Sequence, residues 1–183
     1  MADRISTGNR DDRLTPDHQT VEEPWLRGPV AGVIAELQPV AHALLFAREE
    51  LERILATLRD DQVWQAPHGA ASIGYHVRHC SGSTMRMLTY ARGESLSDEQ
   101  FAALKAEKVP DPSLTTADLL RIANQAIDAA LDVVRATSVT QLDEPRLVGR
   151  RKLPSTVRGL LNEIVLHTAR HIGQIATTAR ILE

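Results

Sequence analysis

Apolar residues recur at three- and four-residue spacing along most of the chain, which is the spacing of one face of an α-helix. The first long run begins at Pro39, a residue suited to the first turn of a helix, and continues to about residue 58. A shorter helical piece, "VAGVIAEL", precedes it from Val30. The predicted buried face of the long helix consists of Val40, Leu44, Ala47, Leu51, Ile54, Leu55 and Leu58.

Three further long helices are predicted by the same spacing and by their N-cap residues. The second occupies residues 72–91 after a Ser72 cap, the third follows Thr115 or Thr116, and the last spans about residues 156–182. A short helix, "SDEQFAALKAEK", is expected between the second and the third. Four long amphipathic helices with few β signals predict an all-α four-helix bundle. The long irregular segment before the last helix leaves room for a crossover connection.

The chain is expected to form one domain preceded by a tail. Its 183 residues are enough for a sizeable core. Residues 1–23 are polar and charged and have no apolar stripe, which predicts a flexible tail. Trp25 stands between two prolines, and we expect its side chain to hold the tail against the body of the protein. The bundle domain is expected to cover residues 24–183.

Composition and charge exclude several classes of partner. Aromatic residues make up 3% of the chain, too few for a stacking platform for bases, and the net charge of −3 gives no general attraction to nucleic acid or anionic membranes. No run approaches the roughly 20 apolar residues that span a bilayer. The one cysteine, Cys80, cannot form an internal disulfide, and the opening segment does not resemble a secretory signal. We therefore expect a cytoplasmic protein.

The stretch "HTARHIGQI" places His167 and His171 on one side of the last helix. At about 100° per residue they lie only about 40° apart, at the edge of the buried stripe. Two imidazoles on one half-buried stripe cannot both be protonated without a large cost, whereas a shared transition-metal ion removes the conflict. Histidines on successive turns of a helix are a known way to present two nitrogens to one metal. A buried histidine satisfied by one carbonyl is the ordinary alternative.

A third ligand is expected from the second helix. In "SIGYHVRHCSGSTMRMLTYA", His79 lies at the border of the apolar arc, and His76 lies about 60° further into it. Angular counting alone does not choose between the two. Three histidines that leave one position for water are the usual catalytic zinc arrangement.

Several motifs together resemble a known family. "SIGYHVRHCSG" and the later "LPSTVRGLLNEIVLHTARHIGQI", with "EPWLRGPV" and "YARGE", are similar to the DinB-like (YfiT-like) metalloenzymes over about residues 24–183. The resemblance implies a four-helix bundle, often a homodimer, with a divalent metal, usually zinc or nickel, held by three histidines. Carried over by position, these ligands are His79, His167 and His171.

The resemblance also implies a class of chemistry. Family members include thiol-dependent maleylpyruvate isomerases and transferases that use mycothiol or bacillithiol, and others are described as metal-dependent hydrolases. The shared principle is a metal that lowers the pKa of a bound thiol or water. We therefore expect a small-molecule substrate and, as a further cofactor, a low-molecular-weight thiol. The alternatives are a bundle that binds a metal or ligand without catalysis and, in third place, a metal-free interaction protein.

Other residues of the second helix are candidates for the wall of the site. His76, when it is not a ligand, is a candidate for the pocket wall or for supporting a ligand. Tyr75 and Tyr90 lie near the same edge as His79, so either can supply a hydroxyl, although tyrosine at helical spacing is more often part of the core. Cys80 falls well inside the apolar arc, which favours a buried, inert thiol over a nucleophile.

Charged residues provide two further hypotheses. Glu163 lies one turn before His167 and is either a carboxylate that supports the site or a solvated residue paired with Arg170. Arg150 and Arg151 belong to the one basic run, which is usually a solvated loop. If the run folds over the open metal position, it can bind the carboxylates of a thiol or an acidic substrate. The run consists of Arg146, Arg150, Arg151, Lys152 and Arg158.

Overall fold

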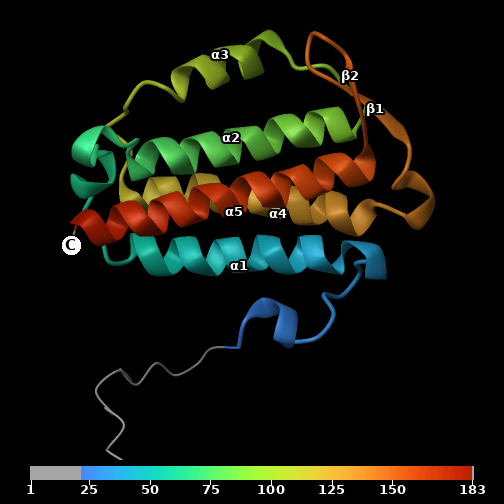
Figure 1. The fold of residues 1–183 in the computed structure, drawn as a ribbon, viewed down its shortest axis with the longest axis horizontal. Helices are drawn as coiled ribbons and strands as arrows, with labels where there is room; N and C mark the ends of the chain where they lie inside the picture. Colours follow the sequence, from blue (N-terminus) through green and yellow to red (C-terminus); the bar gives the residue numbers. More distant parts are fainter. Residues whose placement is uncertain (1–21, 183) are drawn as a thin grey trace, which may run out of the picture.

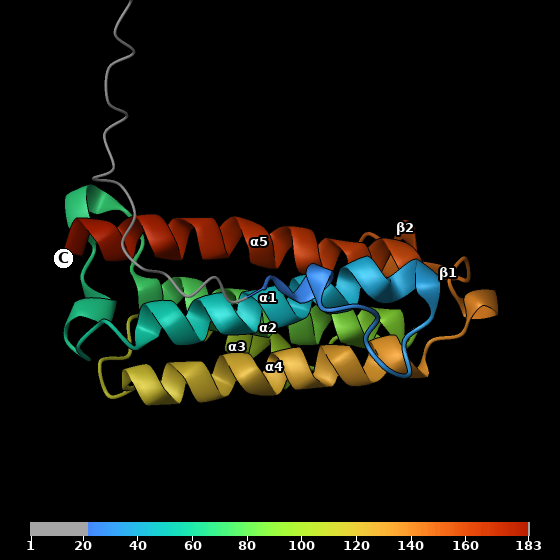
Figure 2. The same ribbon diagram turned by 90° about the horizontal axis from the view of Figure 1, so that it is seen from below.

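Four long helices form the body of the protein in the computed structural model, which describes residues 22–182. They are α1 (Gln38–Leu55), α2 (Ile73–Ala91), α4 (Thr116–Ala136) and α5 (Val157–Leu182). The predicted all-α four-helix bundle is confirmed (Figures 1 and 2). None of the helices in this part of the chain has both the length and the apolar character needed to cross a membrane.

The order of the helices around the bundle differs from their order along the chain. Each helix packs against two neighbours in the cyclic order α1, α4, α2, α5. α1 and α5 run in one direction and α2 and α4 in the other (Figure 1). Because α2 and α4 are parallel neighbours, the chain returns along the bundle between them through α3 (Asp98–Ala106), on the outside of α2 (Figure 1). The long crossover is therefore residues 92–115, and not the segment before α5.

The apolar core is divided into two parts along the bundle axis. Val157, Leu161 and Ile164 of α5 and Leu88 of α2 belong to one part. Residues 172–179 of α5 and Val77 of α2 belong to the other. Polar side chains are buried between the two parts, so the sequence leaves a polar layer in the middle of the bundle. They include Ser81, Thr84, Thr168 and His171.

Side-chain caps fix where the helices that carry the site begin. The Ser72 hydroxyl accepts a hydrogen bond of 3.2 Å from the backbone N–H of Tyr75. Ser97 forms a capping box at the start of α3, and Thr115 forms one with Asp118 at the start of α4. Each cap satisfies backbone N–H groups that have no partner inside the helix. The predicted caps Ser72 and Ser97 are confirmed, and Thr115 is the cap of α4.

The segment before α5 contains an antiparallel hairpin that the sequence pattern did not predict. Its strands are β1 (Pro145–Val148) and β2 (Leu153–Thr156). Gly149 and Lys152 have positive φ angles of 69° and 49° on either side of the turn. Strands of four residues are too short for an alternating pattern to stand out. β1 packs on α2, which brings the basic turn of the hairpin to the end of the bundle.

Predictions for the N-terminal part need correction. Trp25 does not hold the tail, because its side chain is 61% exposed, and Pro24 is buried instead. Residues 30–34 are not helical; a short 3₁₀ turn precedes α1, and α1 ends at Leu55. The predicted flexible tail, residues 1–23, lies outside the described residues except for its last two.

Candidate metal centre

Three histidine rings from two helices meet in the polar layer of the bundle. His167 and His171 occupy successive turns of α5, and His79 faces them from the antiparallel helix α2. The centroids of the two α5 rings are 4.5 Å apart, and that of His79 is 5.1 and 5.0 Å from them. One nitrogen of each ring lies within 4.8 Å of the others. Tetrahedral ligands at ~2.1 Å from an ion are ~3.4 Å apart, so small rotations give this group the spacing of a metal site.

The three histidines differ in burial. His171 is 7% exposed and lies against the core. His79 and His167 are only half-buried. Solvent therefore reaches part of His79 and of His167, while His171 is enclosed by the core.

A buried carboxylate, Glu107, supports His79 from behind. Nδ1 of His79 lies 2.9 Å from Oε2 of Glu107, which comes from the residue that follows α3. Arg86 donates a hydrogen bond to each of the two carboxylate oxygens of Glu107, and the bond to Oε2 is 3.3 Å long. A carboxylate on Nδ1 fixes the tautomer and the rotation of the ring and leaves Nε2 for a metal. The sequence analysis missed Glu107, because only the fold brings the end of α3 to His79.

His76 contacts Nδ1 of His171, as Glu107 contacts Nδ1 of His79. The two Nδ1 atoms are 2.9 Å apart, and one of them must donate while the other accepts. His76 is buried, so this contact restricts the rotation of the His171 ring. His76 is therefore a neighbour of one ring of the cluster rather than a member of it. Angular counting on the sequence left that choice open.

Tyr75 covers a face of His79. The two rings are stacked, with centroids 5.4 Å apart and an interplanar angle of 4°. Tyr75 also meets the His76 ring edge-on, at a centroid distance of 5.3 Å. The aromatic ring thus limits the motion of His79 on the side that Glu107 does not hold.

Burial favours the neutral form of three of these imidazoles. Desolvation, with the nearby rings of His167, His76 and His79, lowers the pKa of His171 from 6.5 to about 4. Desolvation also lowers the pKa of His167, with a contribution from His79 and an opposing one from Glu163. The pKa of His76 is lowered by the same cause. Because only a neutral imidazole binds a metal, these shifts reduce competition from protons near pH 7.

The donor atoms of the cluster fit a divalent transition metal. Nδ1 of His167 is buried and has no hydrogen-bond partner among the described residues. Buried polar atoms without a partner are rare, and an imidazole nitrogen in that state is available to a metal ion. Three neutral imidazoles are a donor set that suits zinc and nickel. The group can therefore hold a divalent metal ion.

Glu163 lies near the cluster but does not support it directly. Its side chain belongs to an exposed residue, and it acts on His167 through its charge. An ion pair of Glu163 with Arg170 is not found among residues 22–182, so the pairing proposed from the sequence is not formed. The positive charge of Arg170 instead contributes to the lowered pKa of His171.

The remaining sequence candidates lie elsewhere. Tyr90 packs in a small apolar cluster about three turns further along α2 than His79. The guanidinium of Arg150 lies 4.8 Å from the centroid of the Phe101 ring, and Arg151 is exposed. The basic run therefore does not fold over the three rings, because the hairpin holds it at the end of the bundle.

Cys80, next to His79, is a buried free thiol. Burial raises its pKa to about 12, so the thiolate is not formed near neutral pH. The structure agrees with the interpretation of Cys80 as an inert core residue.

The fold and the cluster together define a class, namely helical bundles with a candidate centre of three histidines from two helices. Residues 43–175 match the model of the DinB superfamily, and the chain belongs to that superfamily. The resemblance seen in the sequence motifs is thus confirmed. A comparison with curated proteins gives no match.

A solved structure shows the same fold. YfiT from Bacillus subtilis is 19% identical, and the match covers 84% of this chain and 91% of that chain with a TM-score of 0.55. YfiT is described as a probable metal-dependent hydrolase with an unusual four-helix bundle topology. At this identity the likeness establishes the shared fold.

Proposed function

We propose that the chain is a metal-dependent enzyme in which His79, His167 and His171 hold one divalent ion, zinc or nickel, and that it acts on a small molecule. A structural zinc site is closed by four protein ligands, whereas a catalytic site has three and an open position. The observation that carries the proposal is that this cluster offers three imidazoles, two of them half-buried, and that no fourth His, Cys, Asp or Glu belongs to it among the described residues. When bound, the ion would supply Lewis-acid activation of a water or a thiol near neutral pH.

The residues around the cluster prepare the ligands. Glu107 and Arg86 hold His79 with its Nδ1 occupied, and His76 holds His171 in the same manner. Ligands held in this way need little reorganisation when they bind an ion, which favours both affinity and a constant geometry. The lowered pKa of His171 keeps that ring unprotonated near neutral pH.

Two reactions are compatible with the site. In hydrolysis, water adds to an electrophilic centre and the leaving group departs with the bonding electrons and a proton. In thiol transfer, a carbon–sulfur bond forms, the leaving group departs with its bonding electrons, and the thiol proton passes to solvent. The description of YfiT favours hydrolysis. Thiol transfer is the second candidate because the family that the sequence motifs resemble includes thiol-dependent enzymes, and the sequence does not choose between the two reactions.

The first measurement is the metal content of the purified protein. We expect untagged protein grown with zinc and nickel to contain about one ion per chain, and His171→Ala to contain much less. The loaded protein is then assayed for hydrolysis of 4-nitrophenyl acetate. Transfer of glutathione, mycothiol or bacillithiol to 1-chloro-2,4-dinitrobenzene is assayed in parallel.

The outcomes separate the candidate functions. Turnover without thiol that is lost in His171→Ala supports a hydrolase, and thiol-dependent turnover with the same loss supports a transferase. Metal binding without either activity favours the alternative of a non-catalytic metal-binding bundle. Protein that takes up no transition metal contradicts the proposal.

A further inference from the structure

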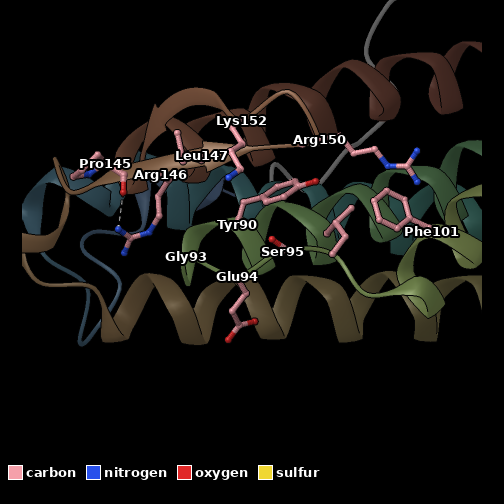
Figure 3. Close-up of a pocket in the computed structure, with 12 residues that line it drawn as sticks. Tyr90, Gly93, Glu94, Ser95, Phe101, Pro145, Arg146, Leu147, Arg150 and Lys152 are labelled. Carbon is pink, nitrogen blue, oxygen red and sulfur yellow. Dashed lines mark hydrogen bonds between the residues drawn. The ribbon is translucent and has the colours of Figure 1, made fainter.

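A hollow lies at the far end of α2 from the cluster. It has a volume of about 490 Å³ and is enclosed by the end of α2, the loop of residues 93–96, α3 and the β1–β2 hairpin (Figure 3). That volume lies within the ~300–1,000 Å³ typical of small-molecule sites. Tyr90 lies about 16 Å along α2 from His79 at 1.5 Å per residue, so the hollow is separate from the three rings.

Tyr90 contributes a polar atom to the lining of this hollow. The residue is 7% exposed, and its ring packs in the apolar cluster that contains Leu160. Its hydroxyl points along the hollow toward Arg150 and makes no hydrogen bond to the other side chains that line it (Figure 3). The hydroxyl oxygen is not among the buried atoms without a partner in residues 22–182, so it opens into the hollow, where it can donate to a ligand or to water.

Two positive charges line the hollow at separate places, and neither has an acidic partner in the part of the chain that the structure describes (Figure 3). Arg150 lies over the Phe101 ring, which holds its planar guanidinium at the rim. Lys152 projects from the hairpin turn toward the Tyr90 ring (Figure 3). Neither forms an ion pair within 4.0 Å with any carboxylate in the part of the chain that the structure describes.

The other charged residues of the lining are already neutralised. Arg146 donates to Oε2 of Glu144 at 2.9 Å and to the carbonyl of Ala91 at 2.7 Å. Glu94 is paired with Arg92 at 3.1 Å, and its carboxylate points away from Lys152 (Figure 3). The hollow therefore presents two uncompensated cations and one free hydroxyl beside apolar surface.

We propose that this hollow is a binding site for a small organic carboxylate with a planar apolar body. Arg150 binds the carboxylate, because a guanidinium forms charge-assisted hydrogen bonds with it, and Lys152 adds a favourable positive charge from the other side of the Tyr90 ring. The Tyr90 hydroxyl donates a further hydrogen bond to the anion. The apolar body is covered by Leu96 and the aromatic rings of the lining. The site needs no metal, so it stands apart from the proposed function of the three-histidine cluster.

Calorimetric titration with benzoate tests this site, with benzyl alcohol and acetate as matched ligands. Benzoate should bind saturably, and each of the other two at least about tenfold more weakly, because one lacks the charge and the other the apolar body. Tyr90→Phe removes one hydroxyl and should weaken benzoate about fivefold. Arg150→Gln should weaken it about tenfold, and Lys152→Gln, which removes a more distant charge, by about threefold or less.

Arg151→Gln is the matched control, because Arg151 is the exposed neighbour that does not line the hollow. It should change benzoate affinity by less than about twofold. His171→Ala should also leave benzoate binding unchanged, so that failure of the metal site and failure of this site give different results. The proposal is overturned if benzoate shows no saturable binding or if benzyl alcohol binds equally well. It is also overturned if Arg151→Gln weakens benzoate as much as Arg150→Gln does.

Discussion

Replacing Glu107 by glutamine should weaken metal binding at the three-histidine cluster about 10- to 100-fold while the bundle stays folded. Glutamine has the shape of glutamate but one oxygen and one NH₂ in place of two oxygens. In the native protein Oε2 accepts from Nδ1 of His79, and both oxygens accept from Arg86. No rotation of a glutamine amide satisfies both neighbours, because one of them must face an NH₂ group.

The magnitude follows from which contact is lost. If the NH₂ group faces His79, Nδ1 must accept, the ring proton moves to Nε2, and the nitrogen that would bind a metal is blocked. If the NH₂ group faces Arg86, two donors oppose each other and the side chain shifts away. Either loss corresponds to ~1.4–2.8 kcal/mol of binding free energy, the equivalent of a 10- to 100-fold change in affinity.

The effect on stability depends on the replacement. The side chains of Arg86 and Glu107 are 8% and 7% exposed. Glu107→Ala leaves the guanidinium buried without its partner and should cost ~3–5 kcal/mol of unfolding free energy. Glu107→Gln keeps one acceptor and should cost ~1–3 kcal/mol. Glutamine therefore separates the effect on metal affinity from loss of the fold.

Chelator competition measures the zinc or nickel affinity, and urea unfolding of the metal-free protein measures stability. Glu163→Gln is the matched control, since it removes an exposed carboxylate near the same rings. It should change metal affinity by less than about threefold. An affinity of Glu107→Gln equal to that of the wild type, in a folded protein, would refute the role assigned to Glu107.

Three further results are expected. Gly82→Ala should lower metal affinity and destabilise the protein by ~1–3 kcal/mol, because its Cβ would overlap Oε1 of Glu107 and lie 2.8 Å from Nη1 of Arg86. Chelator competition measures the affinity, and a value equal to that of the wild type would contradict this prediction. The unfolding free energy of the metal-free protein should fall by up to ~3 kcal/mol as the pH drops from 6.5 to about 4, because the unfolded chain binds a proton that folded His171 does not take up until about pH 4. Urea titrations at several pH values should show a shallower pH dependence of this free energy for His171→Ala than for the wild type, and equal pH dependences would contradict the prediction. Cys80 should react with a thiol reagent such as 5,5′-dithiobis(2-nitrobenzoate) only after unfolding, because burial raises its pKa to about 12; rapid labelling of the native protein would show that the thiol is accessible.

The helices and part of the site could be predicted from the sequence because the geometry within a helix is local. A four-residue separation brings His167 and His171 to one side of α5 in any fold that keeps this helix. The caps at Ser72 and Ser97 likewise depend on residues three positions apart, so the starts of α2 and α3 were predictable.

Tertiary structure alone decided which groups meet across elements. Angular counting could not choose between His76 and His79, because the choice depends on how α2 is rotated against α5. The fold places His79 beside the α5 pair and His76 behind His171. Glu107 left no local signal at all, since its partners lie 21 and 28 residues away on another helix.

The difference between local geometry and tertiary contacts also explains the incorrect predictions for surface residues. The sequence determined by itself that Trp25 is large and apolar and that residues 146–152 are basic. It did not determine that Trp25 would remain 61% exposed, or that a hairpin would hold Arg150 over Phe101 away from the three rings. Exposure and juxtaposition depend on what packs against a residue, and those partners come from distant parts of the chain.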